Sequence, residues 1–168
     1  MDEKKFVFKM NPNLGFILVA VISVLSLVGA LISQHVFGMQ PCAWCVLQRL
    51  IFVMIAILSI AAIFIEKNNK LNFGFIIFFS ILGIAAGLYQ NLVAAKSFDC
   101  NVSIAEKIIS SLRLNEFIPE IFGIFALCAE ETPKLLGLDY SWVGVIMFVI
   151  ISDLALLFLV SLIRNPKD

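Results

Sequence analysis

Two cysteines separated by two residues form the motif in this sequence that is best suited to chemistry. Cys42 and Cys45 can close a small disulfide ring, and C-x-x-C pairs are typical of thiols that cycle between reduced and oxidised states. A long apolar run follows Cys45, so we predict that Cys45 lies at the start of a helix, where unpaired amides stabilise a thiolate. Arg49 follows one turn later on the same face and supplies a cation. We therefore interpret Cys42 and Cys45 as a redox pair, with Arg49 stabilising the thiolate and a reduced, anionic acceptor.

A second pair of cysteines, Cys100 and Cys128, lies farther along the chain. Four thiolates can also bind a zinc ion, but this second pair lacks the C-x-x-C spacing usual in such sites, and we expect no metal. The wide spacing favours a disulfide in a flexible loop. We therefore predict a relay by thiol–disulfide exchange, in which one pair reacts with a soluble partner and the other reduces a lipid-soluble acceptor.

The elements that must position these cysteines are predicted to be membrane helices. Of the 168 residues, 61% are hydrophobic and 14% are charged, whereas soluble domains are about half apolar and about a quarter charged. The net charge of zero argues against a nucleic-acid partner. Apolar runs of about 20 residues can cross a bilayer. We therefore predict a single all-α membrane domain over residues 1–168, a bundle of four transmembrane helices at about 14–32, 46–65, 73–95 and 143–163.

Seven of the twelve Lys and Arg residues fall on one side of these spans, whereas on the other side residues 33–41 have none and the long loop is net acidic. Loops rich in Lys and Arg stay in the cytoplasm, so we predict that both termini are cytoplasmic and that loops 33–45 and 96–142 lie on the far side of the membrane. All four cysteines then face the compartment in which disulfides persist. The basic residues that set this orientation are Lys4, Lys5, Lys9, Lys67, Lys70, Arg164 and Lys167.

The long outer loop contains a short helical pattern. Ile104, Ile108 and Leu112 recur every four residues among polar side chains, which predicts an amphipathic helix. Such a helix either lies in the membrane interface, in contact with lipid, or packs on top of the bundle.

The sequence resembles the disulfide bond formation protein B (DsbB) family from the first span to the last. The residues that carry the resemblance are Gln34 to Val36, Pro41 to Arg49, Cys100, Cys128 to Glu130, Leu136 to Leu138 and Trp142. Members of this family are bacterial inner-membrane enzymes that reoxidise a periplasmic thioredoxin-fold thiol oxidase of the DsbA type and pass the electrons to quinone. The resemblance implies the same activity here, with ubiquinone or menaquinone as cofactor and the cysteines facing the periplasm.

The resemblance also implies a role for each matching residue. Cys100 forms the mixed disulfide with the reduced partner, and Cys128 is then released to attack Cys42. Cys45 passes the electrons to the bound quinone, and Arg49 stabilises the charge on it.

Several polar residues do not fit this catalytic set. Gln48 and Gln90 stand where some relatives carry Glu and His, so we expect any contact they make with quinone to be neutral hydrogen bonding. Asp153 lies in the middle of the fourth span, where a carboxylate is costly. We expect a protonated Asp153 that shares a hydrogen bond inside the bundle, with Ser59 or Ser80 as the candidate partner. Trp44 and Trp142 are expected to be interface anchors.

Two other functions fit parts of the pattern. A vitamin K epoxide reductase-like enzyme also combines four spans, a C-x-x-C and a quinone, but its C-x-x-C follows the loop cysteines, whereas here it comes first. A noncatalytic membrane scaffold with a structural disulfide between Cys100 and Cys128 is the alternative outside enzymes.

Overall fold

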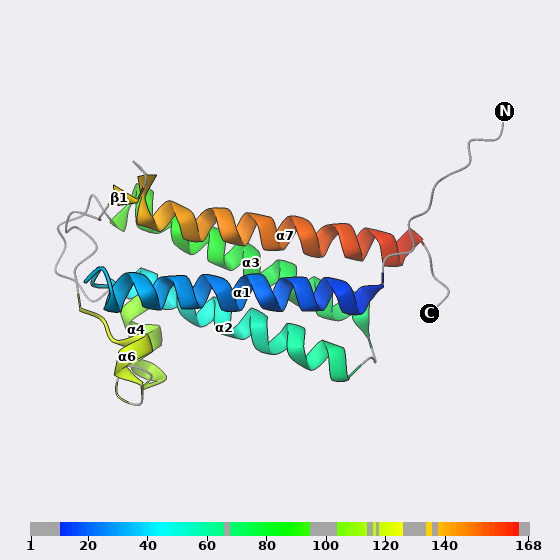
Figure 1. The fold of residues 1–168 in the computed structure, drawn as a ribbon, viewed down its shortest axis with the longest axis horizontal. Coiled ribbons are helices and arrows are strands. Elements are labelled where there is room, and N and C mark those ends of the chain that lie inside the picture. The colour runs from blue at the N-terminus through cyan, green and yellow to red at the C-terminus, as the bar shows by residue number, and fades with distance from the viewer. Residues whose placement is uncertain are drawn as a thin grey trace.

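A bundle of four long helices forms the body of the molecule in the computed structural model (Figure 1). The structure describes residues 11–65, 68–94, 104–113, 116, 118–125, 134–135 and 138–164. The long helices are α1 (Pro12–His35), α2 (Ala43–Phe64), α3 (Asn69–Leu92) and α7 (Tyr140–Arg164). Each is long and apolar enough to cross a membrane, which confirms the predicted four-helix membrane bundle. The third helix begins and ends a few residues earlier than the predicted span 73–95.

Local sequence signals set the start of α1 and the connection from its end to the start of α2, where the C-x-x-C lies. At the start of α1, the side chain of Asn11 caps the helix by accepting a hydrogen bond from the amide of Asn13 at 3.1 Å. After α1 ends, the chain turns through Gly38, whose φ of 65° favours glycine. Cys42 then has extended backbone angles as the N-cap of α2, and its carbonyl accepts the amide of Val46 at 3.0 Å.

Stacked aromatic rings fill the core between the long helices. Phe52 of α2 stacks on Phe148 of α7 with ring centroids 4.0 Å apart. Nearer the end where α1 begins, Phe73 of α3 lies between Phe16 and Phe158, at 4.2 and 5.8 Å. These rings are almost fully buried and belong to one apolar cluster to which all four long helices contribute. Dense packing of this kind is the main attraction between helices in lipid, where no hydrophobic effect drives them together.

A small residue allows α3 and α7 to approach closely, and we predict that enlarging it destabilises the bundle. A Cβ added at Gly83 would lie 2.6 Å from three ring atoms of Phe148, which cannot easily move because it stacks on Phe52. Gly83→Ala is therefore expected to lower the free energy of unfolding by about 1–3 kcal/mol. Unfolding in mixed detergent micelles, followed by circular dichroism, measures this loss. Gly74→Ala in the same helix is the matched control, since nothing lies within 4 Å of its added Cβ; an equal loss in both variants would contradict the prediction.

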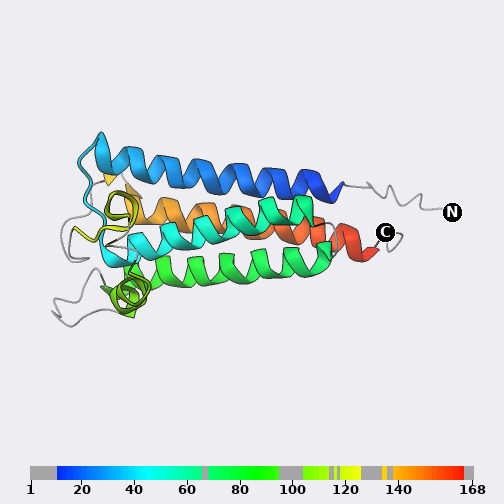
Figure 2. The same cartoon turned by 90° about the horizontal axis from the view of Figure 1, so that it is seen from below.

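Short elements cluster at the end of the bundle where α2 begins. They are the helices α4 (Ile104–Ser111) and α6 (Pro119–Phe122) and the antiparallel strands β1 (Lys134–Leu135) and β2 (Leu138–Asp139). Helices α4 and α6 run across the long axis of the bundle in Figure 1 and are seen end-on in Figure 2. Helix α1 begins and α7 ends at the opposite end. The side of the membrane that each end faces stays a prediction from the basic residues.

The predicted amphipathic helix is confirmed as α4, and it has two apolar faces. Ala105 and Ile109 are fully buried, and Ile109 packs with Val46 of α2 and Phe122 of α6. The repeating residues that predicted the helix, Ile104, Ile108 and Leu112, are instead exposed. Packing on the bundle thus uses one face and leaves the predicted face available for the membrane interface.

The prediction that Asp153 bonds inside the bundle is wrong. Its side chain is exposed, whereas Ile151 and Ala155, two residues away on either side, are fully buried. Two positions along a helix correspond to about 200° of rotation, so Asp153 points away from the core. The hydroxyl of Ser80 donates to the carbonyl of Ile76 at 2.8 Å, and that of Ser59 is buried without a hydrogen-bond partner among the described residues.

Candidate functional site

The cysteines of the C-x-x-C lie side by side at the start of α2. Cys42 is the N-cap and Cys45 the third helical residue, which confirms the prediction that Cys45 lies at the start of a helix. Residues three apart share a helical face, and the two sulfur atoms are 3.5 Å apart as hydrogen-bonded thiols. Cys42 is 5% exposed and Cys45 is half-buried. A disulfide requires the sulfurs to approach to about 2 Å, so a small local movement suffices to oxidise the pair.

The side chain of Gln90 links helix α3 to both sulfurs. Its Nε2 donates to Sγ of Cys45 at 3.1 Å and lies 3.6 Å from Sγ of Cys42. Its Oε1 accepts a hydrogen bond from Nε2 of Gln48 at 2.7 Å. Both amides are buried, so a neutral hydrogen-bonded chain runs from α2 through α3 to the thiols.

The sequence singled out both glutamines but did not place them beside the thiols. One feature of the sequence could have indicated that they lie inside the bundle: each is an uncharged polar residue near the end of an apolar span. Polar groups at such positions are rare in membrane helices and usually have a partner inside the bundle.

Gly144 of α7 makes room for Gln48, and Gly87 of α3 makes room for α7 beside it. A Cβ added at Gly144 would collide with Oε1 of Gln48, and one at Gly87 would collide with Val145. A larger residue at Gly144 would therefore displace the amide that supports Gln90.

We predict that Gln90 increases the reactivity of Cys45, because an amide donor stabilises a thiolate relative to a thiol. Gln90→Leu removes this donor and is expected to slow alkylation of Cys45 by iodoacetamide about tenfold, the effect of losing one hydrogen bond to a charged group. The rate is measured by mass spectrometry in a Cys42→Ser background, so that one thiol of the motif reacts. Tyr89→Phe is the control, since it changes the neighbouring residue without removing a donor to sulfur and should leave the rate unaltered. An unchanged alkylation rate in Gln90→Leu would contradict the prediction.

Arg49 is buried and joins three segments of the chain. The side chain is 4% exposed. Its Nη1 donates to Oε1 of Gln34 at 2.6 Å and to the carbonyl of Ile121 at 3.0 Å, and its Nη2 donates to the carbonyl of Ala30 at 3.1 Å. Gln34 in turn donates to the carbonyl of Glu120 at 3.3 Å. The guanidinium therefore ties α2 to the last turns of α1, where the helix dipole favours a cation, and to α6.

That Arg49 stabilises a Cys45 thiolate stays a prediction from the sequence. Both residues lie in the first two turns of α2, as expected. Cys42 and Gln90 donate hydrogen bonds to the sulfur of Cys45. The three hydrogen bonds given above for Arg49 instead reach α1 and α6. Position along one helix thus brought the two residues to the same level of the bundle, and contacts with other helices set the direction of each side chain.

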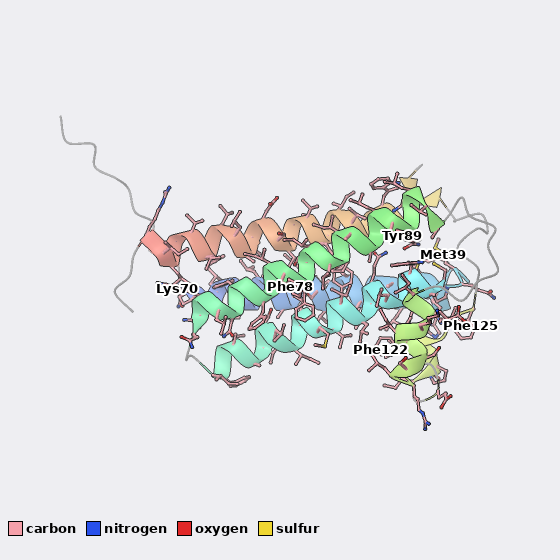
Figure 3. The ribbon with its side chains drawn as sticks, turned by 180° about the vertical axis from the view of Figure 1, so that it is seen from behind. Met39, Lys70, Phe78, Tyr89, Phe122 and Phe125 are labelled. Carbon is pink, nitrogen blue, oxygen red and sulfur yellow. The ribbon has the colours of Figure 1, made fainter. Side chains whose placement is uncertain are left out.

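Trp44 is part of the wall of the site, which corrects its predicted role as an interface anchor. It is 9% exposed, and its ring lies 4.7 Å from that of Tyr89 on α3. The amide of Phe125 donates to the carbonyl of Pro41 at 3.0 Å, which holds the segment after α6 beside the C-x-x-C. Figure 3 shows Tyr89, Phe122 and Phe125 at this end of the bundle, far from Lys70 at the other.

The second cysteine pair, Cys100 and Cys128, lies outside the described residues. Its predicted role therefore stays a prediction from the sequence. The chain between these cysteines is described in α4 and α6, which pack on α2 close to the C-x-x-C.

Comparison with known proteins identifies the family of the chain. The family model for disulfide bond formation protein DsbB matches residues 12–159. The chain belongs to the disulfide bond formation protein B family. Among its relatives, a disulfide bond formation protein B of Ralstonia nicotianae is 34% identical, over 94% of this chain and 98% of the relative. One from Cupriavidus metallidurans is 31% identical, over 94% and 96%.

Membership in the DsbB family confirms the resemblance seen in the sequence. The relatives are named for disulfide bond formation. This name agrees with the oxidoreductase chemistry predicted from the cysteines. The family and the four helices long enough to span a membrane fit a multi-pass protein of the inner membrane.

Proposed function

We propose that the chain is a quinone-dependent thiol oxidase that reoxidises a periplasmic, DsbA-like thiol oxidase. The observation that supports this proposal best is the pair of thiols at the start of a membrane helix. Their sulfurs are 3.5 Å apart, and a buried amide donor lies 3.1 Å from Cys45. When oxidised to a disulfide, such a pair can accept two electrons by thiol–disulfide exchange, and as two thiols it can pass them to a lipid-soluble acceptor at the same level of the membrane.

The exchange begins at the second cysteine pair. A thiolate of the reduced partner attacks Cys100 in a Cys100–Cys128 disulfide and releases Cys128 as a thiolate. Cys128 attacks Cys42 in the oxidised C-x-x-C and releases Cys45 as a thiolate. The second thiol of the partner then breaks the mixed disulfide, and the released Cys100 displaces Cys42 from Cys128. The partner is oxidised, the loop disulfide is restored, and Cys42 and Cys45 hold the electron pair as two thiols.

The residues around Cys45 supply what its release requires. The amide of Gln90 is already within hydrogen-bond distance of the leaving sulfur, and the Gln48 amide fixes the orientation of Gln90. Burial of these amides prevents water from competing for the same hydrogen bonds.

The described residues also fit a quinone. Its carbonyl oxygens need hydrogen-bond donors, and the guanidinium of Arg49 and the amide of Gln48 are donors in the first turns of α2. We propose that Arg49 holds the quinone and stabilises negative charge on it. When bound, the quinone accepts two electrons and two protons. Ubiquinone and menaquinone both fit this donor set.

The proposed orientation puts the thiols in the periplasm and both termini in the cytoplasm. It is supported by the positions of Lys70 and Arg164 near the end of the bundle opposite the C-x-x-C. Labelling of intact cells with a membrane-impermeant maleimide tests it.

An assay of quinone absorbance tests the proposed function. The protein is purified in detergent, supplied with ubiquinone and mixed with a reduced thioredoxin-fold periplasmic oxidase. We expect the absorbance of the oxidised quinone to fall as the partner becomes oxidised. No change with either ubiquinone or menaquinone, with the thiols shown to be accessible, would rule out the proposed activity.

A further inference from the structure

An acidic residue lies at the centre of the lipid-facing side of α7. Asp153 is eleven residues from either end of the spanning segment Trp142–Arg164, which corresponds to about 16 Å at 1.5 Å per residue. Its side chain is exposed and makes no hydrogen bond or ion pair with another described residue. The aspartate side chain is too short to reach water across that distance, so this carboxyl must find a partner within the membrane.

The surface around Asp153 is otherwise apolar and suited to helix packing. The exposed residues that share this side of α7 are Ile146, Val149, Ile150, Leu156, Leu157 and Val160. The core contacts of α7 use Phe148, Ile151 and Ala155. The side with Asp153 is therefore not covered by the described parts of the bundle.

We propose that this side of α7 pairs with α7 of a second copy of the chain. A two-fold axis along the membrane normal brings both Asp153 side chains to the same depth. A neutral carboxyl has one donor and one acceptor, so two of them facing each other satisfy both groups with two hydrogen bonds. In the described long helices, the basic residues Arg49, Lys70 and Arg164 lie near helix ends. No cation of a second copy therefore lies at the depth of Asp153 within these helices, and the matching group is Asp153 itself.

Energy transfer between labelled copies in liposomes tests this pairing. Donor- and acceptor-labelled protein is reconstituted together and diluted with lipid. Wild type and Asp153→Asn are expected to associate, because facing amides also form paired hydrogen bonds. Asp153→Leu keeps an apolar surface and should weaken association about tenfold. Leu25→Ala, on the exposed side of α1, is the matched control and should associate as wild type does.

Three results would overturn the proposal. Wild type that stays monomeric at every dilution would point to a different protein as the partner of Asp153. Association of Asp153→Leu as strong as that of wild type would show that the carboxyl does not hold the copies together. Equal loss in Asp153→Asn and Asp153→Leu would exclude a pair held by facing hydrogen bonds.

Discussion

Replacing Cys45 by serine is expected to abolish quinone reduction while leaving the fold intact. Cys45 is the thiol of the pair that lies nearer to the Gln90 amide, at 3.1 Å against 3.6 Å for Cys42, and serine cannot form the disulfide with Cys42 on which the transfer depends. The decrease in quinone absorbance after addition of reduced partner should fall to the rate seen without the protein. The partner should stay reduced when its thiols are counted by alkylation.

The thermal stability of the Cys45→Ser variant provides the control. Serine is close in size to cysteine, and Cys45 is half-buried, so the unfolding midpoint should stay near that of wild type. A variant that folds normally and still reduces quinone at the wild-type rate would show that electrons do not pass through this pair.

Arg49→Lys is expected to raise the KM for quinone ten- to hundredfold. This factor corresponds to a loss of about 1.5–3 kcal/mol of binding free energy, the contribution of hydrogen bonds from a charged group. Lysine keeps the charge, but its ammonium cannot reproduce the planar set of donors with which Arg49 binds oxygens on α1 and α6. Initial rates at varied quinone concentration, with the partner saturating, measure this change.

Gln34→Leu tests whether Arg49 acts through its charge or through the contacts that hold α6 in place. This variant retains Arg49 but removes the oxygen that accepts from it and the amide that reaches Glu120. We expect faster proteolysis near α6 and a smaller change in KM for quinone than in Arg49→Lys. If the two variants raised the KM equally, Arg49 would act through the position of α6 rather than on the quinone.

The sequence by itself determined the four spans, the helical start at the C-x-x-C and the helix α4. These features depend on residues close together in the chain: a run of about 20 apolar residues is a helix in lipid because every backbone group must bond internally. The cysteine spacing likewise puts Cys42 and Cys45 on one face whatever the rest of the chain does.

Only the tertiary structure decided which side chains meet. Gln90 is 45 residues from Cys45 in the chain yet donates to its sulfur, and Arg49 donates to Ile121 across 72 residues. The same holds for Asp153, which the sequence placed inside the bundle and the structure places outside. A helix that is apolar on all sides carries no periodic signal for its inward face. Its rotation is set by packing against neighbouring helices, as where Gly83 admits the ring of Phe148.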